Sequence, residues 1–292
     1  MRSSALAADD PEAIPERAPA PFLKWAGGKR QLLPKIEALL PREIDTYYEP
    51  FVGGAALFFR LAALGLFKKA VLADVNPDLV DCYLAIRDDV EGVIEALGEY
   101  RNDSECYYAT RAESPASTVA RAARLIYLNK CGYNGLYRVN SKGHFNVPFG
   151  RYLDPNICDE PRLRAASSAL KLAKIVRRDF EGAVAGAGER DFVYFDPPYV
   201  PLSKTASFTA YSGAFPYSEQ DRLATLLRSL GARGVPALLS NSYSPITRKL
   251  YRGLRPKRVP ARRSINSVGR ARGPVDEILV RSFPYPLRDD PR

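Results

Sequence analysis

The segment FVYFDPPY, residues 192–199, joins an apolar run to an acidic residue, two prolines and a tyrosine. The run predicts a buried strand, so Asp196 stands at its carboxyl end, where open α/β sheets bind ligands. The two prolines make a rigid turn and leave the Pro197 carbonyl without a partner within the chain. Together with the Tyr199 ring, these acceptors suit a planar base with an exocyclic amine. An ordinary turn is the competing interpretation, because Asp-Pro is common in turns.

The composition excludes several classes of site. The 292 residues suffice for a full core without disulfides. The four cysteines are irregularly spaced and His144 is the single histidine, so we expect no metal site and no Cys/His nucleophile pair. No segment approaches the ~20 apolar residues of a membrane helix. We therefore expect a cytoplasmic protein with no membrane partner.

The charge is unevenly distributed. The formal net charge is +10, and residues 248–275 contain ten basic and no acidic side chains. A solvated surface explains such a run equally well. A polyanionic partner is favoured only if the run flanks a site that handles bases.

One of two glycine-rich stretches suggests a nucleotide-like ligand. Residues 47–51 predict a strand, Gly53-Gly54 a tight turn, and residues 55–64 a helix. A second strand ends at Asp74, roughly 20 residues later, the offset of a ribose-binding acid. Asp74 either grips two ribose hydroxyls or caps a helix near Pro77. Gly27-Gly28-Lys29 does not fit a P-loop, because Arg30 follows the lysine.

The middle of the chain changes texture twice. Residues 78–129 are charged and have apolar residues at helical spacing. Residues 130–152 are rich in Gly, Asn, Tyr and Arg and contain the turn signal Asn134-Gly135. A loop-and-hairpin surface of this composition suits base recognition, because rings wedge into a stack and guanidinium groups bind guanine.

These patterns predict an α/β fold with a mostly parallel sheet, an antiparallel end strand at 275–283, and an inserted helical and hairpin lobe. Residues 235–239 form a further strand that ends in Ser240-Asn241-Ser242. We expect a flexible tail at residues 1–18, a catalytic domain at 19–76 and 161–292, and a target-recognition domain at 77–160.

Six ordered motifs carry a resemblance to a known family. They are FLKWAGGK at 22–29, EPFVGG at 49–54, ADVN at 73–76, NGLYRVN at 134–140, FNVPFG at 145–150 and DPPY at 196–199. From about residue 21 to 284 the chain resembles the Dam-type DNA adenine-N6 methyltransferases of the alpha group. The resemblance implies a Rossmann-like methyltransferase sheet and transfer of a methyl group from S-adenosylmethionine to adenine in double-stranded DNA. It also implies that the cytoplasmic protein is associated with the nucleoid.

The resemblance also implies roles for individual residues. Asp196, Pro197 and Tyr199 would form the catalytic corner. The cofactor would lie against a second set: Trp25, Lys29, Gly53, Gly54, Asp74 and Asp196. The target base would be flipped out of the helix, and the loop that carries Phe208 and Tyr211 would help to enclose it.

The same resemblance assigns the DNA contacts and favours GATC as the target. Tyr133 would insert into the base stack, and Asn134 would steady the displaced strand. Base edges would be touched by Leu136, Arg138 and Pro148, with Lys24 assisting. Two simpler interpretations stay open here: a phosphate or surface role for Arg138, and a core position for Tyr133.

Two other functions stay open. The first keeps the cofactor but acts on RNA or a protein amide, and the aromatic and basic segment 130–152 argues against it. The second is a catalytically silent DNA-binding protein. Retention of Asp196, Tyr199, Asp74 and Lys29 argues against this hypothesis.

Overall fold

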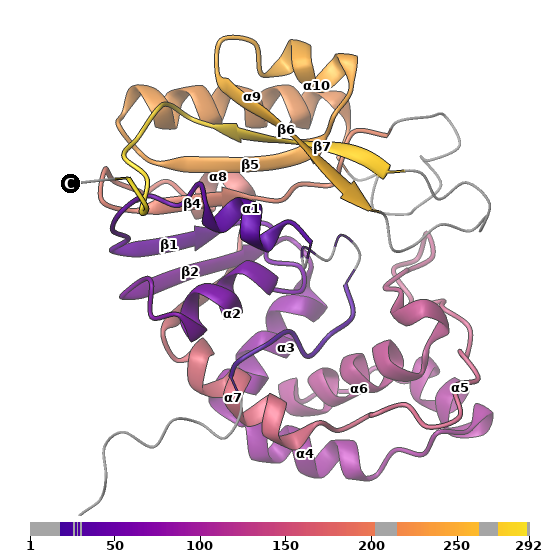
Figure 1. The fold of residues 1–292 in the computed structure, drawn as a ribbon. Helices are drawn as coiled ribbons and strands as arrows, with labels where there is room; N and C mark the ends of the chain where they lie inside the picture. Colours follow the sequence, from indigo (N-terminus) through magenta and orange to yellow (C-terminus); the bar gives the residue numbers. More distant parts are fainter. Residues whose placement is uncertain are drawn as a thin grey trace, which may run out of the picture.

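One sheet organises the molecule. The computed structural model describes residues 18–25, 27, 29, 31–201, 215–262 and 274–290. Its strands are β1 (Thr46–Glu49), β2 (Lys69–Asp74), β3 (Ala173–Arg177), β4 (Phe192–Phe195), β5 (Ala237–Ser242), β6 (Arg255–Arg262) and β7 (Pro274–Arg281). They lie in the order β3-β2-β1-β4-β5-β7-β6 (Figure 1). β1 to β5 are parallel and β7 is antiparallel, which confirms the predicted α/β fold.

The antiparallel strand β7 does not form the edge of the sheet. It lies between β5 and the edge strand β6, which the sequence analysis does not predict. β6 contains Pro256 and Pro260, and prolines are confined to edge strands because they cannot donate to a second neighbour. Its basic side chains also discourage pairing with another chain. Part of the basic run is therefore a protected sheet edge.

Helices cover both faces of the sheet. On one face lie α1 (Leu33–Glu37), α2 (Ala56–Ala63), α3 (Pro77–Asp88) and α7 (Glu160–Leu170); on the other lie α8 (Phe180–Ala183), α9 (Tyr217–Ala232) and α10 (Pro245–Leu250). Successive strand residues alternate between these layers: Tyr47 and Phe192 pack on the first, Tyr48 and Val193 on the second. Burying each such side chain contributes about 1.5–3 kcal/mol.

A helical lobe lies between β2 and α7 in the chain. It contains α3, α4 (Val90–Gly98), α5 (Ser104–Ala112) and α6 (Thr118–Cys131), followed by the short turn η1 (Tyr133–Gly135). Antiparallel bridges join Gly132 to Phe149 and Val139 to Phe145, so the predicted helices and hairpin-like segment are confirmed. One hydrophobic cluster runs from the sheet into this lobe. The predicted domain boundaries at residues 76–77 and 160–161 stay a prediction.

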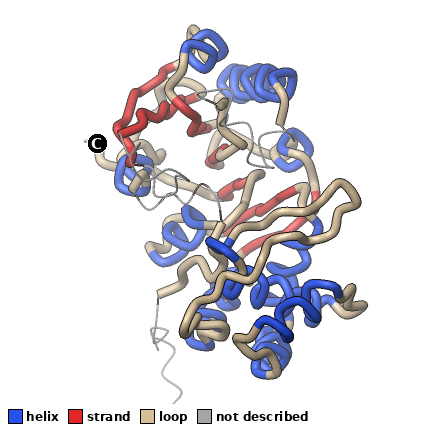
Figure 2. The backbone as a smooth tube through the Cα atoms, turned by 90° about the vertical axis from the view of Figure 1, so that its right-hand side faces the viewer, coloured by secondary structure: helices blue, strands red, loops and turns tan. Residues whose placement is uncertain are grey.

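The carboxyl ends of the parallel strands meet at one edge of the sheet. In Figure 2, which views the molecule from the right-hand side of Figure 1, this edge faces the reader with the helical lobe below it. Asp74 ends β2, Asp196 follows β4, and the turn at Gly53 follows β1. Within the described residues, no helix is long and apolar enough to cross a membrane.

Candidate active site

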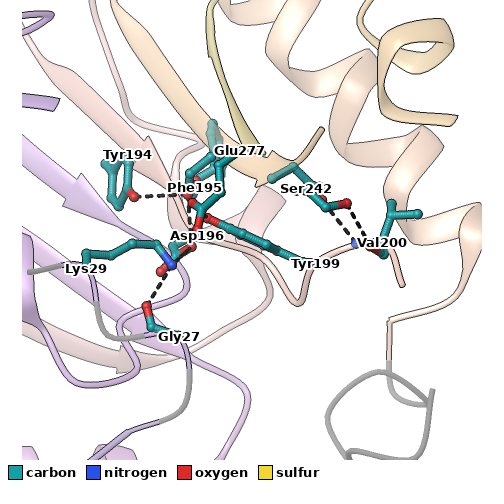
Figure 3. A network of polar contacts seen from close by, with 11 residues as sticks. Gly27, Lys29, Tyr194, Phe195, Asp196, Tyr199, Val200, Ser242 and Glu277 are labelled. Carbon is teal, nitrogen blue, oxygen red and sulfur yellow. Dashed lines mark hydrogen bonds and ion pairs between the residues drawn. The ribbon is translucent and has the colours of Figure 1, made fainter. Parts of the chain in front are cut away.

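Side chains from β5, β7 and α9 hold the segment after β4. Gln220 Nε2 donates to the Pro198 carbonyl at 2.8 Å, and Val200 N donates to Asn241 Oδ1 at 3.0 Å. Ser242 Oγ donates to the Val200 carbonyl at 2.7 Å (Figure 3). The residues of β5 that do this are fully buried, although the sequence places them just after the strand. They belong to the strand because they pair with Ile278 and Glu277 of β7, and the corner satisfies their polar side chains.

One carboxylate oxygen of Asp196 is bound by other side chains of the protein. Its Oδ1 accepts from Lys29 Nζ at 2.8 Å and from Ser240 Oγ at 2.9 Å. Among the described residues, none donates to Asp196 Oδ2 or to the Pro197 carbonyl. The side chain of Asp196 keeps 19% of its surface exposed. The corner therefore presents two acceptors that are free to bind a ligand.

The Lys29 side chain lies at the corner formed by Asp196 and Pro197 and is shielded from solvent. Its Nζ also donates to the Gly27 carbonyl at 2.7 Å and stands 4.7 Å from the centre of the Tyr199 ring (Figure 3). The side chain is 7% exposed. Lys29 thus joins the glycine-containing segment before α1 to the DPPY motif.

Glu49 is a buried carboxyl group that the sequence analysis missed. It ends β1, is 3% exposed, and accepts from Phe58 N at 3.2 Å through Oε2. Its pKa is raised to about 8, chiefly by burial and also by the negative charge of Asp196; the Phe58 N–H and the positive charge of Lys29 oppose this. At neutral pH Glu49 is mostly protonated. The sequence feature that could have indicated this group is a single acidic residue at the end of a predicted apolar strand.

Asp74 lies beside the glycine turn. It accepts from Gly53 N at 3.4 Å and from Asn76 N at 3.0 Å. Burial raises its pKa, and these backbone N–H groups oppose the shift. The alternative that Asp74 caps the following helix is wrong, because the side chain of Asn76 caps α3. Asp74 is left facing the first glycine, as a ribose-binding acid requires.

Trp25 lies over that turn. A Cβ on Gly53 would approach Trp25 Cδ1 to 3.0 Å, and one on Gly54 would approach Trp25 Cβ to 3.2 Å. Gly53 also has φ +45°, a conformation that favours glycine. Trp25 stacks on Tyr137 with ring centroids 5.3 Å apart. An indole, a glycine backbone and a buried acid fit an adenosine-bearing methyl donor, which offers a flat ring and two ribose hydroxyls.

Lys24 is tied to the turn η1 by one buried amide, that of Asn129, which the sequence analysis missed. Asn129 Oδ1 accepts from Lys24 N at 2.8 Å, and Asn129 Nδ2 donates to the carbonyls of Lys24 at 2.7 Å and Gly135 at 3.0 Å. Gly135 has φ +61°, and a Cβ there would lie 2.6 Å from Lys24 Cδ. The segment before Trp25 and the turn η1 therefore form one unit.

Three of the other candidate DNA contacts, Tyr133, Asn134 and Pro148, are exposed. Tyr133 is 53% exposed, so its assignment to the core is wrong, and its N–H donates to the Pro148 carbonyl at 2.9 Å. Asn134 has φ +56° and donates from its backbone to the Tyr152 hydroxyl. Pro148 is exposed, whereas Leu136 is half-buried against the core.

Arg138 is exposed and its orientation is fixed. Its Nε donates to Asn146 Oδ1 at 2.7 Å, and one terminal nitrogen donates to the Asn146 carbonyl at 3.0 Å. Asn146 therefore holds one edge of the guanidinium group and does not occupy the other edge. His144 is exposed in the adjoining loop, as expected. Phe208, Tyr211 and the basic residues 263–272 lie outside the described residues.

Within the ranges that the structure describes, no three His, Cys, Asp or Glu side chains form a group that could hold a metal ion. Cys82 and Cys131 are buried and Cys106 and Cys158 half-buried, all as free thiols.

Comparison with known proteins gives a consistent result. Residues 25–265 match the family of D12 class N6 adenine-specific DNA methyltransferases. A Type II methyltransferase, M1.LlaDCHI, from Lactococcus lactis subsp. cremoris is 43% identical over 274 residues, covering 90% of this chain and 95% of the relative. M.MjaIII from Methanocaldococcus jannaschii is 44% identical over 285 residues (90% and 99%). A DNA adenine methylase from Escherichia coli is 39% identical over 266 residues (89% and 94%).

The rRNA methyltransferase aviRa from Streptomyces viridochromogenes has a TM-score of 0.38 and 17% identity, covering 86% of this chain and 82% of that one. A likeness at this level does not bear on function.

Proposed function

Because this chain belongs to the family of D12 class N6 adenine-specific DNA methyltransferases, we propose that it methylates adenine N6 within GATC in duplex DNA, on a base flipped out of the helix. Family membership makes the chain an adenine-specific DNA methyltransferase, with DNA as substrate and a methyl donor of the S-adenosylmethionine type. The target sequence, the flipping and the residue roles are the proposal.

One observation carries the catalytic assignment: two acceptors at the rigid corner, Asp196 Oδ2 and the Pro197 carbonyl, have no donor among the described residues. Adenine N6 carries two N–H bonds, so one goes to each acceptor. Its lone pair is delocalised into the ring, which makes the amine a poor nucleophile. Two fixed acceptors favour a tetrahedral nitrogen and stabilise the positive charge that develops on it.

The charge at the corner suits this role. Glu49 is mostly neutral at pH 7, with a pKa of about 8, and so does not compete with Asp196 for the positive charge of Lys29. Tyr199 presents an aromatic face on which the flipped base stacks. Asp196 accepts a hydrogen bond from one N6–H group. It therefore lies next to the nitrogen that loses a proton when the methyl group is transferred.

The donor site adjoins this corner. Asp74 would bind the ribose hydroxyls, Trp25 would pack on the adenosine, and Gly53 and Gly54 would let the backbone approach closely. Lys29 and Asp196 would line the end nearest the reacting atoms. When bound, S-adenosylmethionine supplies an electrophilic methyl group, and the chain's own contribution is to hold the amine in line with it.

Recognition rests on the surface around η1. Tyr133 would fill the space vacated by the flipped base, since its ring is exposed and its backbone is fixed to Pro148. Asn134 would steady the displaced strand. Arg138 would bind a guanine with the guanidinium edge that Asn146 leaves free. Leu136, Pro148 and Lys24 would complete the base contacts.

The test uses purified protein, tritiated S-adenosylmethionine and two duplexes that differ only in GATC versus GTTC, each with adenines elsewhere. We expect label in the GATC duplex alone, recovered as N6-methyladenine after nucleoside digestion. Equal labelling of both duplexes would reject GATC. Binding of donor and DNA without any label would favour the silent DNA-binding protein.

Flipping is tested separately by placing 2-aminopurine at the target position. We expect its fluorescence to rise on binding, because the base loses its stacking partners. A Tyr133→Ala variant should bind with a smaller rise. Unchanged fluorescence with the parent protein would contradict base flipping while leaving the methylation itself intact.

A further inference from the structure

Two buried hydroxyl groups lie behind Asp196 and take no part in the chemistry described above. Ser240 belongs to β5 and Tyr194 to β4, which pair in parallel register, with Phe195 opposite Leu239. Both residues are 0% exposed. Ser240 Oγ lies 2.9 Å from Asp196 Oδ1 and 3.0 Å from the Tyr194 hydroxyl. Adjacent strands thus deliver a hydroxyl pair to the carboxylate.

Ser240 Oγ lies 2.9 Å from Asp196 Oδ1 and 3.5 Å from the Phe195 carbonyl, so the nearer and charged carboxylate takes the serine proton. An ionised carboxylate only accepts, so the single proton of Ser240 points at Asp196. The Tyr194 hydroxyl must then donate to Ser240 Oγ. Burial raises the pKa of Tyr194 well above its ordinary value, and the negative charge of Asp196 raises it further, so this hydroxyl keeps its proton. The result is a directed chain from Tyr194 through Ser240 to Asp196 Oδ1.

We propose that Ser240, oriented by Tyr194, is a positioning residue that holds Asp196 Oδ1 so that Oδ2 faces the substrate amine. This inference rests on the proposed role of Asp196. The terminal torsion of an aspartate is broad and twofold, so the carboxylate needs a partner to fix it. Lys29 also binds Oδ1, but through a long side chain, whereas Ser240 is held rigidly within a strand. A misplaced acceptor lowers the rate constant of methyl transfer and leaves the affinity for the substrates largely unchanged.

The main variant is Ser240→Ala, tested with tritiated S-adenosylmethionine and plasmid DNA under single-turnover conditions. We expect the rate constant to fall ~10–100-fold, as misplacement of a reacting group does. The KM values for DNA and donor should stay within twofold. A positioning role predicts this split, because both substrates still bind.

Tyr194→Phe removes the donor that orients Ser240 and should give a smaller fall in rate. The double variant should be no slower than Ser240→Ala, since both changes act through one chain. It also removes both polar groups at once and so avoids leaving a buried hydroxyl unpaired. The double variant therefore provides the test if Ser240→Ala alone does not fold.

Ser282→Ala is the matched control. Ser282 is also buried, and its hydroxyl accepts from Ala237 N at 3.0 Å and donates to the Val235 carbonyl at 3.0 Å, at the opposite end of β5. We expect its rate within twofold of the parent. An equal loss in Ser282→Ala, or a Ser240→Ala or double variant within twofold of the parent, would overturn the inference.

Asp196→Ala separates this inference from the function on which it rests. If Asp196→Ala is inactive and Ser240→Ala is not slowed, only the positioning role is wrong. If Asp196→Ala keeps near-parental turnover, both the catalytic assignment and the positioning role are rejected.

Discussion

Tyr199 donates a 2.8 Å hydrogen bond from its hydroxyl to Glu277 Oε2, so β7 fixes the ring that ends the DPPY motif. Glu277 stands opposite Ser242 in the antiparallel register of β5 and β7. The ring is therefore held by a strand more than seventy residues further along the chain. A stacking face that is set before the base arrives costs less entropy to use.

Tyr199→Phe and Tyr199→Ala should separate the ring from its hydroxyl. Phenylalanine keeps the stacking face, and we expect kcat to fall only a few-fold. Alanine removes the stack, which contributes about 1–3 kcal/mol per base, so kcat should fall much further. Steady-state kinetics on a GATC duplex measure both. Equal losses would assign the effect to the hydroxyl instead of the ring.

Asp196→Asn should abolish methyl transfer while the protein still binds DNA and donor. The amide replaces one carboxylate oxygen by a donor and removes the negative charge that holds Lys29. We expect a loss of more than about 100-fold in the single-turnover rate. Fluorescence anisotropy with a labelled duplex and calorimetry with the donor check binding. Turnover near the parental value would remove Asp196 from the mechanism.

Glu49→Gln should change how stability depends on pH. The folded pKa of Glu49 is about 8 against an ordinary 4.5, so the folded state retains this proton while the unfolded state has lost it. The contribution of Glu49 to the free energy of unfolding is complete below pH 4.5, the ordinary pKa. It is lost as the pH rises from there to about 8, at about 1.4 kcal/mol per pH unit. Glutamine does not titrate and keeps an acceptor for Phe58.

Urea unfolding of both proteins at pH 5, 6.5 and 8 measures this effect. From pH 5 to 6.5 and from 6.5 to 8, the free energy of unfolding of Glu49→Gln should increase relative to that of the parent. Most of this increase should be reached by pH 8. A constant difference between the two proteins across this range would show that Glu49 is ionised in the fold.

Arg138→Ala should relax specificity at one base pair. Losing a bidentate contact to guanine costs about 1–3 kcal/mol in discrimination at that position. The measurement is kcat/KM on duplexes that carry single substitutions through GATC. Asn146→Ala should weaken discrimination at the same position by less, because it only orients the guanidinium group. Uniform weakening on every duplex would instead make Arg138 a phosphate contact.

Local sequence patterns predict the parts of the fold that depend on near neighbours. The apolar run before Asp196, the glycine turn at Gly53 and the acid at Asp74 each follow from a few consecutive residues. The structure places all three at one edge of the sheet because parallel strands end together.

Features that depend on distant pairing were not predictable. The edge strand β6 contains prolines and basic residues, and only its pairing with β7 makes it a strand. The hydroxyl of Ser240 reaches Asp196 from 44 residues away, and Asn129 reaches Lys24 from 105. These groups are polar residues without a local motif, and their burial follows from partners that no short window contains.

The amide of Asn129 joins the segment that leads into Trp25 to the turn that carries Tyr133. In the proposed complex, one end of this link lies at the methyl donor and the other end lies at the DNA duplex. A displacement at one end is therefore transmitted to the other. Thermodynamic reciprocity then applies: whatever factor the nucleoside donor adds to duplex affinity, the duplex adds to donor affinity. The order in which the two arrive alters the path of assembly and leaves the stability of the ternary complex unchanged.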